Sequence, residues 1–200
     1  MQIKSKYKIA RRLGPAIFEK TQTQKFAARM SRKGKKFEGM VTDFGKALLE
    51  KQKARFTYLM NERQFKKYAE KAIAEKSKKP EESLIEALET RLDNVVYRLG
   101  LAPTRLASRQ MVSHGHIAVN GKRVDVPSFT ASIGDLVTVV ASSKGKKIFS
   151  NIAEKSKEAN VPNWLNFDVS KMEGKVLSLP RFSPTELAFD IFTILEFYRR

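Results

Sequence analysis

The chain has 200 residues, and its 39 Lys and Arg against 21 Asp and Glu give a formal net charge of +18. No apolar run is long enough to span a bilayer, and the basic start MQIKSKYKIARR lacks the apolar core of a secretory signal. The absence of cysteine excludes disulfides, thiolate zinc sites and thiol nucleophiles. A basic chain with 42% hydrophobic residues is therefore expected to fold and to bind a polyanion, with nucleic acid favoured over a membrane surface.

The positive charge is concentrated in the N-terminal part of the chain. Residues 1–79 hold 23 Lys/Arg and 7 Asp/Glu, whereas residues 80–147 have a net charge of +2 and residues 148–200 a net charge of zero. An isolated lysine-rich stretch is usually a solvated helix face. An excess sustained over 79 residues repels itself, however, and favours a region that is neutralised by nucleic acid.

Residues 1–42 are predicted to be a basic extension. Their apolar residues occur singly, among Gly14, Pro15 and Gly34, so that no helical stripe is sustained. The run Arg-Lys-Gly-Lys-Lys at 32–36 is typical of a loop that follows phosphates. We expect this extension to become ordered only on its partner.

A helical domain is predicted over 43–90 and is completed by residues 156–200. Thr42 and Asn61 are suited to the N-caps of two helices, and a third helix is predicted as one continuous element over 80–99.

The C-terminal part of this domain has its own pattern. Alternating apolar residues predict a strand at 165–169 that pairs with 176–179. Residues 189–198 form an apolar closing segment that is expected to pack on an earlier helical region.

Residues 91–155 are predicted to be a small module of helices and strands inserted in the helical domain. Thr104 caps a helix over 105–113, after which the apolar period changes to two around Asn120-Gly121, the strongest short-range hairpin signal. A Gly-Asp turn at 134–135 introduces a further strand. The whole chain is thus predicted to be α+β, with a module of two helices and a small antiparallel sheet.

No catalytic or metal-binding pattern is present. His114 and His116 are the only histidines, and no nucleophile elbow or phosphate-binding glycine loop occurs. The triplet Arg-Leu-Asp at 91–93 is similar to a motif of pseudouridine synthases, but it lies within a helical pattern, so we expect Asp93 to make a structural ion pair. We therefore expect no enzyme activity, no cofactor and no metal.

Donor side chains gather on the short helix and at the hairpin tip, where they suit the phosphates and 2′-hydroxyls of folded RNA. The predicted RNA-binding residues of the module are Arg98, Thr104, Arg105, Arg109, Gln110, His114, His116, Asn120, Lys122 and Arg123. In the basic N-terminal region they are Arg11, Arg12, Lys33, Lys35, Lys36, Lys51, Lys53, Arg55, Arg63 and Lys66.

The stretches RLDNVVYRLG at 91–100 and HGHIAVNGKRVD at 114–125 resemble the RNA-binding module of the small-subunit ribosomal protein S4 family. Some pseudouridine synthases, tyrosyl-tRNA synthetases and a heat-shock RNA-binding protein share this module. EKQKARFTYLMNERQFKKY at 50–68 and KMEGKVLSLP at 171–180 also resemble the ribosomal protein and favour it over the other carriers. The terminal LEFYRR adds to the same likeness.

The resemblance implies a structural protein that binds the 5′ domain of small-subunit rRNA directly and early in assembly. It also implies contacts with the neighbouring proteins S5 and S3, and a place near the mRNA entrance that contributes to translational accuracy. The implied location is the small ribosomal subunit, in the cytoplasm or in an organelle. Many members bind zinc through an N-terminal cysteine cluster, and its absence here implies a zinc-free form. Leu106 and Ser113 occupy positions where members of this family commonly have a basic residue.

Two alternatives share the module. An RNA-modifying enzyme would need a catalytic domain, and the rest of the chain has no catalytic motif. A stress factor that recycles stalled subunits would be shorter and would lack the segment at 50–68.

Overall fold

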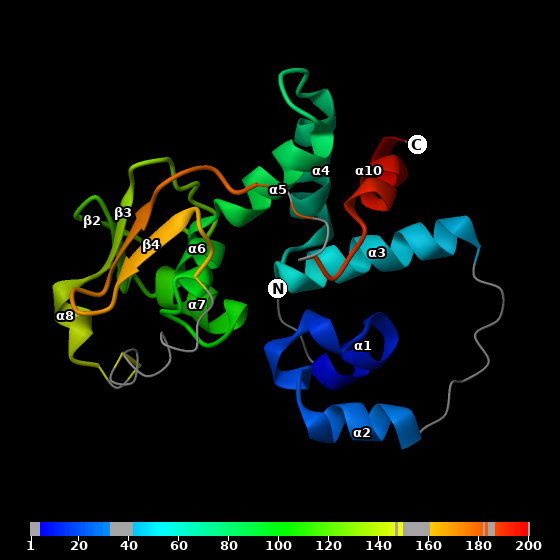
Figure 1. Ribbon diagram of the computed structural model, residues 1–200, viewed down its shortest axis with the longest axis horizontal. Helices are drawn as coiled ribbons and strands as arrows, with labels where there is room; N and C mark the ends of the chain where they lie inside the picture. The colour runs from blue at the N-terminus through cyan, green and yellow to red at the C-terminus, as the bar shows by residue number, and fades with distance from the viewer. Residues whose placement is uncertain are drawn as a thin grey trace. The chain divides into compact units, whose positions relative to one another are not determined.

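The computed structural model describes residues 5–32, 42–146, 148–149, 161–181, 183 and 187–199 (Figure 1). The chain divides into two compact units, one of Met1–Leu84 with Phe182–Arg200 and one of Ile85–Arg181. Within the described ranges, no helix has both the length and the apolar character needed to cross a membrane. The second unit begins before the predicted module and ends after it.

The first unit is helical. It contains α1 (Lys6–Leu13), two short 3-10 turns (Pro15–Ile17 and Glu19–Thr21), α2 (Gln24–Arg32), α3 (Asp43–Thr57), α4 (Glu62–Ala74) and α10 (Ile191–Arg199). α5 (Pro80–Glu89) begins in this unit and ends in the second.

The N-caps predicted for two of these helices are confirmed. Thr42 Oγ1 accepts a hydrogen bond from the Gly45 amide at 3.2 Å, and Asn61 Oδ1 accepts one from the Gln64 amide at 2.7 Å. Each cap satisfies an amide that has no partner within the first helical turn. The starts of α3 and α4 are therefore determined by local sequence.

The C-terminal helix packs on helices made much earlier in the chain. α10 lies beside α3 and α4 (Figure 1), with the Phe197 ring 5.4 Å from that of Phe44 and the Tyr198 ring 6.1 Å from that of Phe65, centroid to centroid. The first unit is thus built from segments that are far apart in sequence.

Residues 5–32 correct the prediction of an extension without its own structure. They form α1, the two 3-10 turns and α2, and their apolar residues join one cluster with Leu59. The Phe18 ring lies 6.3 Å from that of Phe56 on α3. The apolar residues look isolated in sequence because their partners belong to α3 and the turn after it, so a search for a local period does not detect them.

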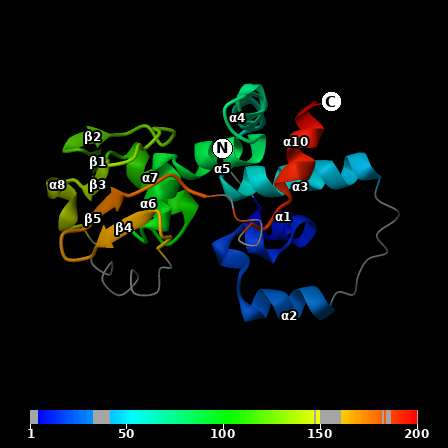
Figure 2. The same ribbon diagram turned by 45° about the horizontal axis from the view of Figure 1, so that its top comes forward.

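The second unit is a five-stranded antiparallel sheet with helices against it (Figure 2). Leu92, Val112 and Val137 lie in its core, which joins α6 (Leu92–Arg98) and α7 (Arg105–Ser113) to the strands. The strand order is β2-β1-β3-β5-β4, with β1 Ile117–Val119, β2 Lys122–Val124, β3 Leu136–Val139, β4 Leu165–Asp168 and β5 Glu173–Val176. A short α8 (Ala141–Lys144) follows β3.

The helix predicted over 80–99 is two helices, α5 and α6, and the prediction of a single element is wrong. Arg91 has an extended backbone and forms a bridge with Thr130. The amide of Leu92 donates to the Phe129 carbonyl at 2.8 Å, and that of Ala131 donates to the Thr90 carbonyl at 2.8 Å. These bonds to a distant loop replace helical ones, and they interrupt an otherwise continuous apolar stripe.

The hairpin predicted at Asn120-Gly121 is confirmed. Both residues have positive φ, +50° and +78°, as a type I′ turn requires. Gly134 also has positive φ and lies in the turn that leads into β3.

The later strands belong to the sheet of the second unit rather than to the helical domain. β4 pairs with β5 over Leu165–Asp168 and Glu173–Val176, and β5 pairs with β3. A Cβ on Gly174 would overlap the Leu99 side chain, so glycine permits β5 to lie close to α6. This pairing extends the second unit beyond the predicted end of the module.

Candidate nucleic-acid interface

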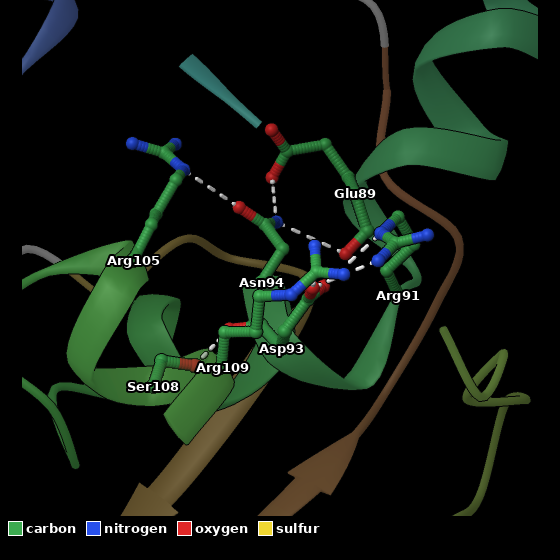
Figure 3. Close-up of polar contacts among 7 residues, drawn as sticks. All are labelled: Glu89, Arg91, Asp93, Asn94, Arg105, Ser108 and Arg109. Carbon is green, nitrogen blue, oxygen red and sulfur yellow. Dashed lines mark hydrogen bonds and ion pairs between the residues drawn. The ribbon is translucent and has the colours of Figure 1, made fainter. Parts of the chain in front are cut away.

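Helix α7 of the second unit is anchored through the buried residue Asp93, which lies on α6. Arg91 makes a bidentate contact with this carboxylate, at 3.1 Å from Nε and 2.8 Å from Nη2, and Arg109 Nη1 approaches it at 3.7 Å (Figure 3). Ser108 of α7 donates a hydrogen bond to the Asp93 carbonyl. The predicted structural ion pair of Asp93 is confirmed, and this network fixes α7 against α6.

A second polar group involves Glu89 and Asn94. The Asn94 amide nitrogen donates to Glu89 Oε2 at 2.8 Å, and its oxygen accepts from Arg105 Nε at 3.0 Å (Figure 3). Arg98 pairs with the same glutamate at 2.9 and 3.0 Å. The carboxylate of Glu89 therefore compensates the charge of Arg98 inside the protein.

Arg105 and Arg109 extend from this network at the start and middle of α7. The Arg105 guanidinium also lies 4.3 Å from the Tyr97 ring centre, and Arg109 keeps 29% of its side chain exposed. Both side chains are held by internal partners in defined positions. Thr104 caps α7 by accepting from the Ala107 amide at 3.1 Å.

Two of the predicted contacts of this unit are exposed at the end of α7, and two are exposed on β2. Gln110 and His114 are exposed at the end of α7, and Lys122 and Arg123 are exposed on β2. Arg123 Nη2 donates to the His114 carbonyl at 3.3 Å, which links the two elements. We call these four residues of the two linked elements the α7–β2 face.

His116 and Asn120 have structural partners instead. His116 is buried, with Nδ1 2.9 Å from Ser143 Oγ, and burial together with the charges of Lys146 and other neighbouring cations lowers its pKa. The Asn120 amide donates to Asp135 at 2.8 Å and its oxygen accepts from the Leu136 amide at 2.9 Å. We therefore leave both residues out of the contact surface.

Several predicted contacts of the first unit are also held inside the protein. Lys51 is buried, with Nζ 2.7 Å from Glu62 and 4.6 Å from the Phe197 ring centre. Burial raises the pKa of Glu62, but hydrogen bonds from Lys51 and Tyr198 outweigh it and lower the pKa overall. Arg55 Nε lies 3.7 Å from the same carboxylate. Lys53 pairs with Glu50, as a salt bridge on α3.

Other predicted cations of the first unit do face solvent. Arg11 and Arg12 are exposed on α1, and Arg63 and Lys66 are exposed on α4. Lys66 lies 3.5 Å from Glu70, an exposed pair of the kind that contributes little to stability. The predicted contacts Lys33, Lys35 and Lys36 lie outside the described residues.

The N-terminal helices carry further cations that the candidate set omitted. Lys25, Arg29 and Arg32 are exposed on α2. Residues 5–32 contain eight Lys/Arg and a single acid, Glu19. The charge count over this segment could have identified these residues, whereas the expectation of an unstructured extension gave no face on which to place them.

Comparison with known proteins gives two family matches. Residues 2–89 match the ribosomal protein S4/S9 N-terminal domain, and residues 90–137 match the S4 domain. The chain is 41% identical to the small ribosomal subunit protein uS4 of Roseiflexus castenholzii, covering 96% of both chains. It is 46% identical to uS4A of Alkaliphilus oremlandii, over 80% of this chain and 76% of the relative. The chain belongs to the bacterial-type family of the small ribosomal subunit protein uS4.

Proposed function

We propose that this protein binds the 5′ domain of small-subunit rRNA directly, through two surfaces, and nucleates assembly there. Family membership already supports a structural, rRNA-binding ribosomal role without enzyme activity. The observation that carries the proposal is the exposed positive charge of α1 and α2, eight Lys/Arg with one acid over residues 5–32. RNA phosphates are the polyanion that compensates such a surface.

The two surfaces have different tasks in this proposal. The helices of the first unit supply phosphate contacts through Arg11, Arg12, Arg63 and Lys66, which give affinity but carry no sequence information. The α7–β2 face adds a sparse set of donors on a rigid support, which fits phosphates and 2′-hydroxyls at defined positions. The second unit would thus orient the protein on RNA that the first unit holds.

The finer parts of the function rest on the family resemblance alone. They are contacts with proteins S5 and S3, a position near the mRNA entrance, and a contribution to translational accuracy. Crosslinking of the protein within purified small subunits would identify its neighbours directly.

The salt dependence of binding tests the main proposal. The full chain is titrated with a transcript of the 5′ domain at several salt concentrations. If about ten phosphates are contacted, log affinity falls against log salt with a slope of about −7 to −9. An affinity independent of salt contradicts the proposal. Recovery of the protein at less than one copy per purified subunit would instead support a recycling factor.

The α7–β2 face is tested by a matched pair of lysines. Lys122→Gln removes an exposed charge from β2, and Lys175→Gln removes one from β5, so the two variants have the same net charge. We expect Lys122→Gln alone to weaken binding to the transcript by about three- to tenfold, on the scale of one lost phosphate contact. Equal effects of the two substitutions would show that the face is placed wrongly.

A further inference from the structure

A basic concavity that includes two aromatic residues in its lining lies within the first unit. It has a volume of about 550 Å³ and is lined by residues of α1, α2 and the turn before α2. Two aromatic residues and four cations contribute to it, namely Tyr7, Phe26, Arg11, Lys25, Arg29 and Arg32. None of its lining residues is acidic.

The two rings have unequal exposure. Phe26 is buried in the cluster that joins α2 to α3, whereas Tyr7 is 53% exposed. Their centroids are 5.9 Å apart with the ring planes tilted by 39°. Phe26 therefore packs beside Tyr7, and the accessible part of the Tyr7 ring offers a flat apolar surface to a ligand in the concavity.

The surrounding charge determines which ligand fits. A wholly apolar ligand would desolvate four cations without compensating them, which is costly. A lone phosphate would compensate the cations but would leave the aromatic ring unused. A nucleotide provides both parts, because its base stacks on an aromatic ring while its phosphates contact Arg and Lys.

We propose that this concavity binds one unstacked nucleobase of the rRNA on Tyr7, with the flanking phosphates held by Arg11, Arg29 and their neighbours. The inference rests on the proposed function, since it assumes that the ligand is RNA. It adds a base-contacting site to a region whose charge alone implies only phosphate contacts.

Fluorescence tests the stacking directly. The wild-type chain has one tryptophan, Trp164, in the second unit, so a Tyr7→Trp variant adds a single new emitter. Stacking on a base is expected to quench the added emission by more than half when the 5′-domain transcript binds. Phe192→Trp is the control, because Phe192 is 55% exposed in the same unit but lies outside the concavity. A fully paired RNA duplex should bind without quenching the emission of the Tyr7→Trp variant.

Substitutions test the energetics. Tyr7→Ala should weaken binding to the transcript by about tenfold, the scale of one stacked base, while the salt slope stays unchanged. Tyr7→Phe retains the ring and should bind within twofold of wild type. Arg29→Gln should instead reduce the salt slope by about one.

The outcomes separate this inference from the proposed function. If the transcript does not quench the Tyr7→Trp variant and the Tyr7→Ala variant binds with wild-type affinity, the base site is overturned and the proposed phosphate binding is unaffected. Failure of the wild-type chain to bind the transcript would overturn the proposed function itself. Equal quenching of the Tyr7→Trp and Phe192→Trp variants would also overturn the site, since it would reflect general proximity to RNA.

Discussion

Two arginines approach the buried carboxylate of Asp93, but the geometry gives them unequal roles. Arg91 is 1% exposed and makes both close contacts, while Arg109 is partly exposed and lies 3.7 Å away. A buried carboxylate that loses its main partner keeps an uncompensated charge, whereas an outer partner can be replaced by water.

Arg91→Met is therefore expected to lower the free energy of unfolding by about 3–5 kcal/mol. Arg109→Met, the matched control, should lower it by less than about 1 kcal/mol. Urea titration monitored by Trp164 fluorescence measures the free energy of unfolding of both variants, because this tryptophan packs against the core of the second unit. Similar decreases in the free energy of unfolding for the two variants would contradict the unequal roles of Arg91 and Arg109.

Stability should also depend on the protonation of His116. Its pKa is lowered by burial, chiefly, and by nearby positive charge. Below pH 6.5, the ordinary pKa of histidine, the unfolded state therefore binds more protons than the folded state. The contribution of His116 to the free energy of unfolding is present above that pH and is lost as the pH falls.

We expect the urea midpoint of the wild type to fall between pH 7.5 and pH 5.5 by more than that of a His116→Gln variant. A His116→Gln variant with an unchanged pH dependence would show that this histidine does not contribute.

At the scale of elements, the β1–β2 hairpin is tied to β3 by the side chain of Asn120. Asn120→Gly removes both side-chain hydrogen bonds but still permits positive φ, and it should cost about 1–3 kcal/mol. Asn120→Ala should cost about 1 kcal/mol more, because alanine is strained at φ +50°. Thermal unfolding of the two variants measures the difference, and equal stability of glycine and alanine here would contradict it.

The elements that could be predicted from sequence are those whose cause is local. Thr42, Asn61 and Thr104 act within one helical turn, and Asn120-Gly121 acts within one hairpin. The break at Thr90 could not be predicted, because its cause is a loop almost forty residues further along the chain.

The same limit applies to the candidate site. Lys51, Arg98 and Asn120 have the chemistry of RNA contacts, and a sequence pattern offers no reason to omit them. Their partners Glu62, Glu89 and Asp135 lie between 9 and 15 residues away and meet them only in the fold. Structural partners, which only the fold reveals, distinguish these residues from others of the same type.

On the scale of the whole molecule, the two units differ in net charge. The first unit has a net charge of +13 and the second one of +5. Among the described residues, the central apolar cluster of the second unit runs from Leu92 to Val176, within this unit's own sequence.

A fragment of residues 80–181 is therefore expected to fold alone, with the Trp164 urea transition of the full chain. Its binding to the 5′-domain transcript should have a salt slope less than half that of the full chain, because most cations are absent. Circular dichroism and the salt titration check the two expectations. A fragment with the same salt slope as the full chain would contradict the proposal that most phosphate contacts lie in the first unit.

The position of α10 has a consequence for synthesis on the ribosome. Domains generally fold as units while the chain emerges, the N-terminal one first. Here α3 and α4 emerge early but must wait for α10, which is translated after the whole second unit. The unit that begins the chain is therefore the one completed last, and until then its nascent helices leave the surface that receives Phe197 and Tyr198 uncovered.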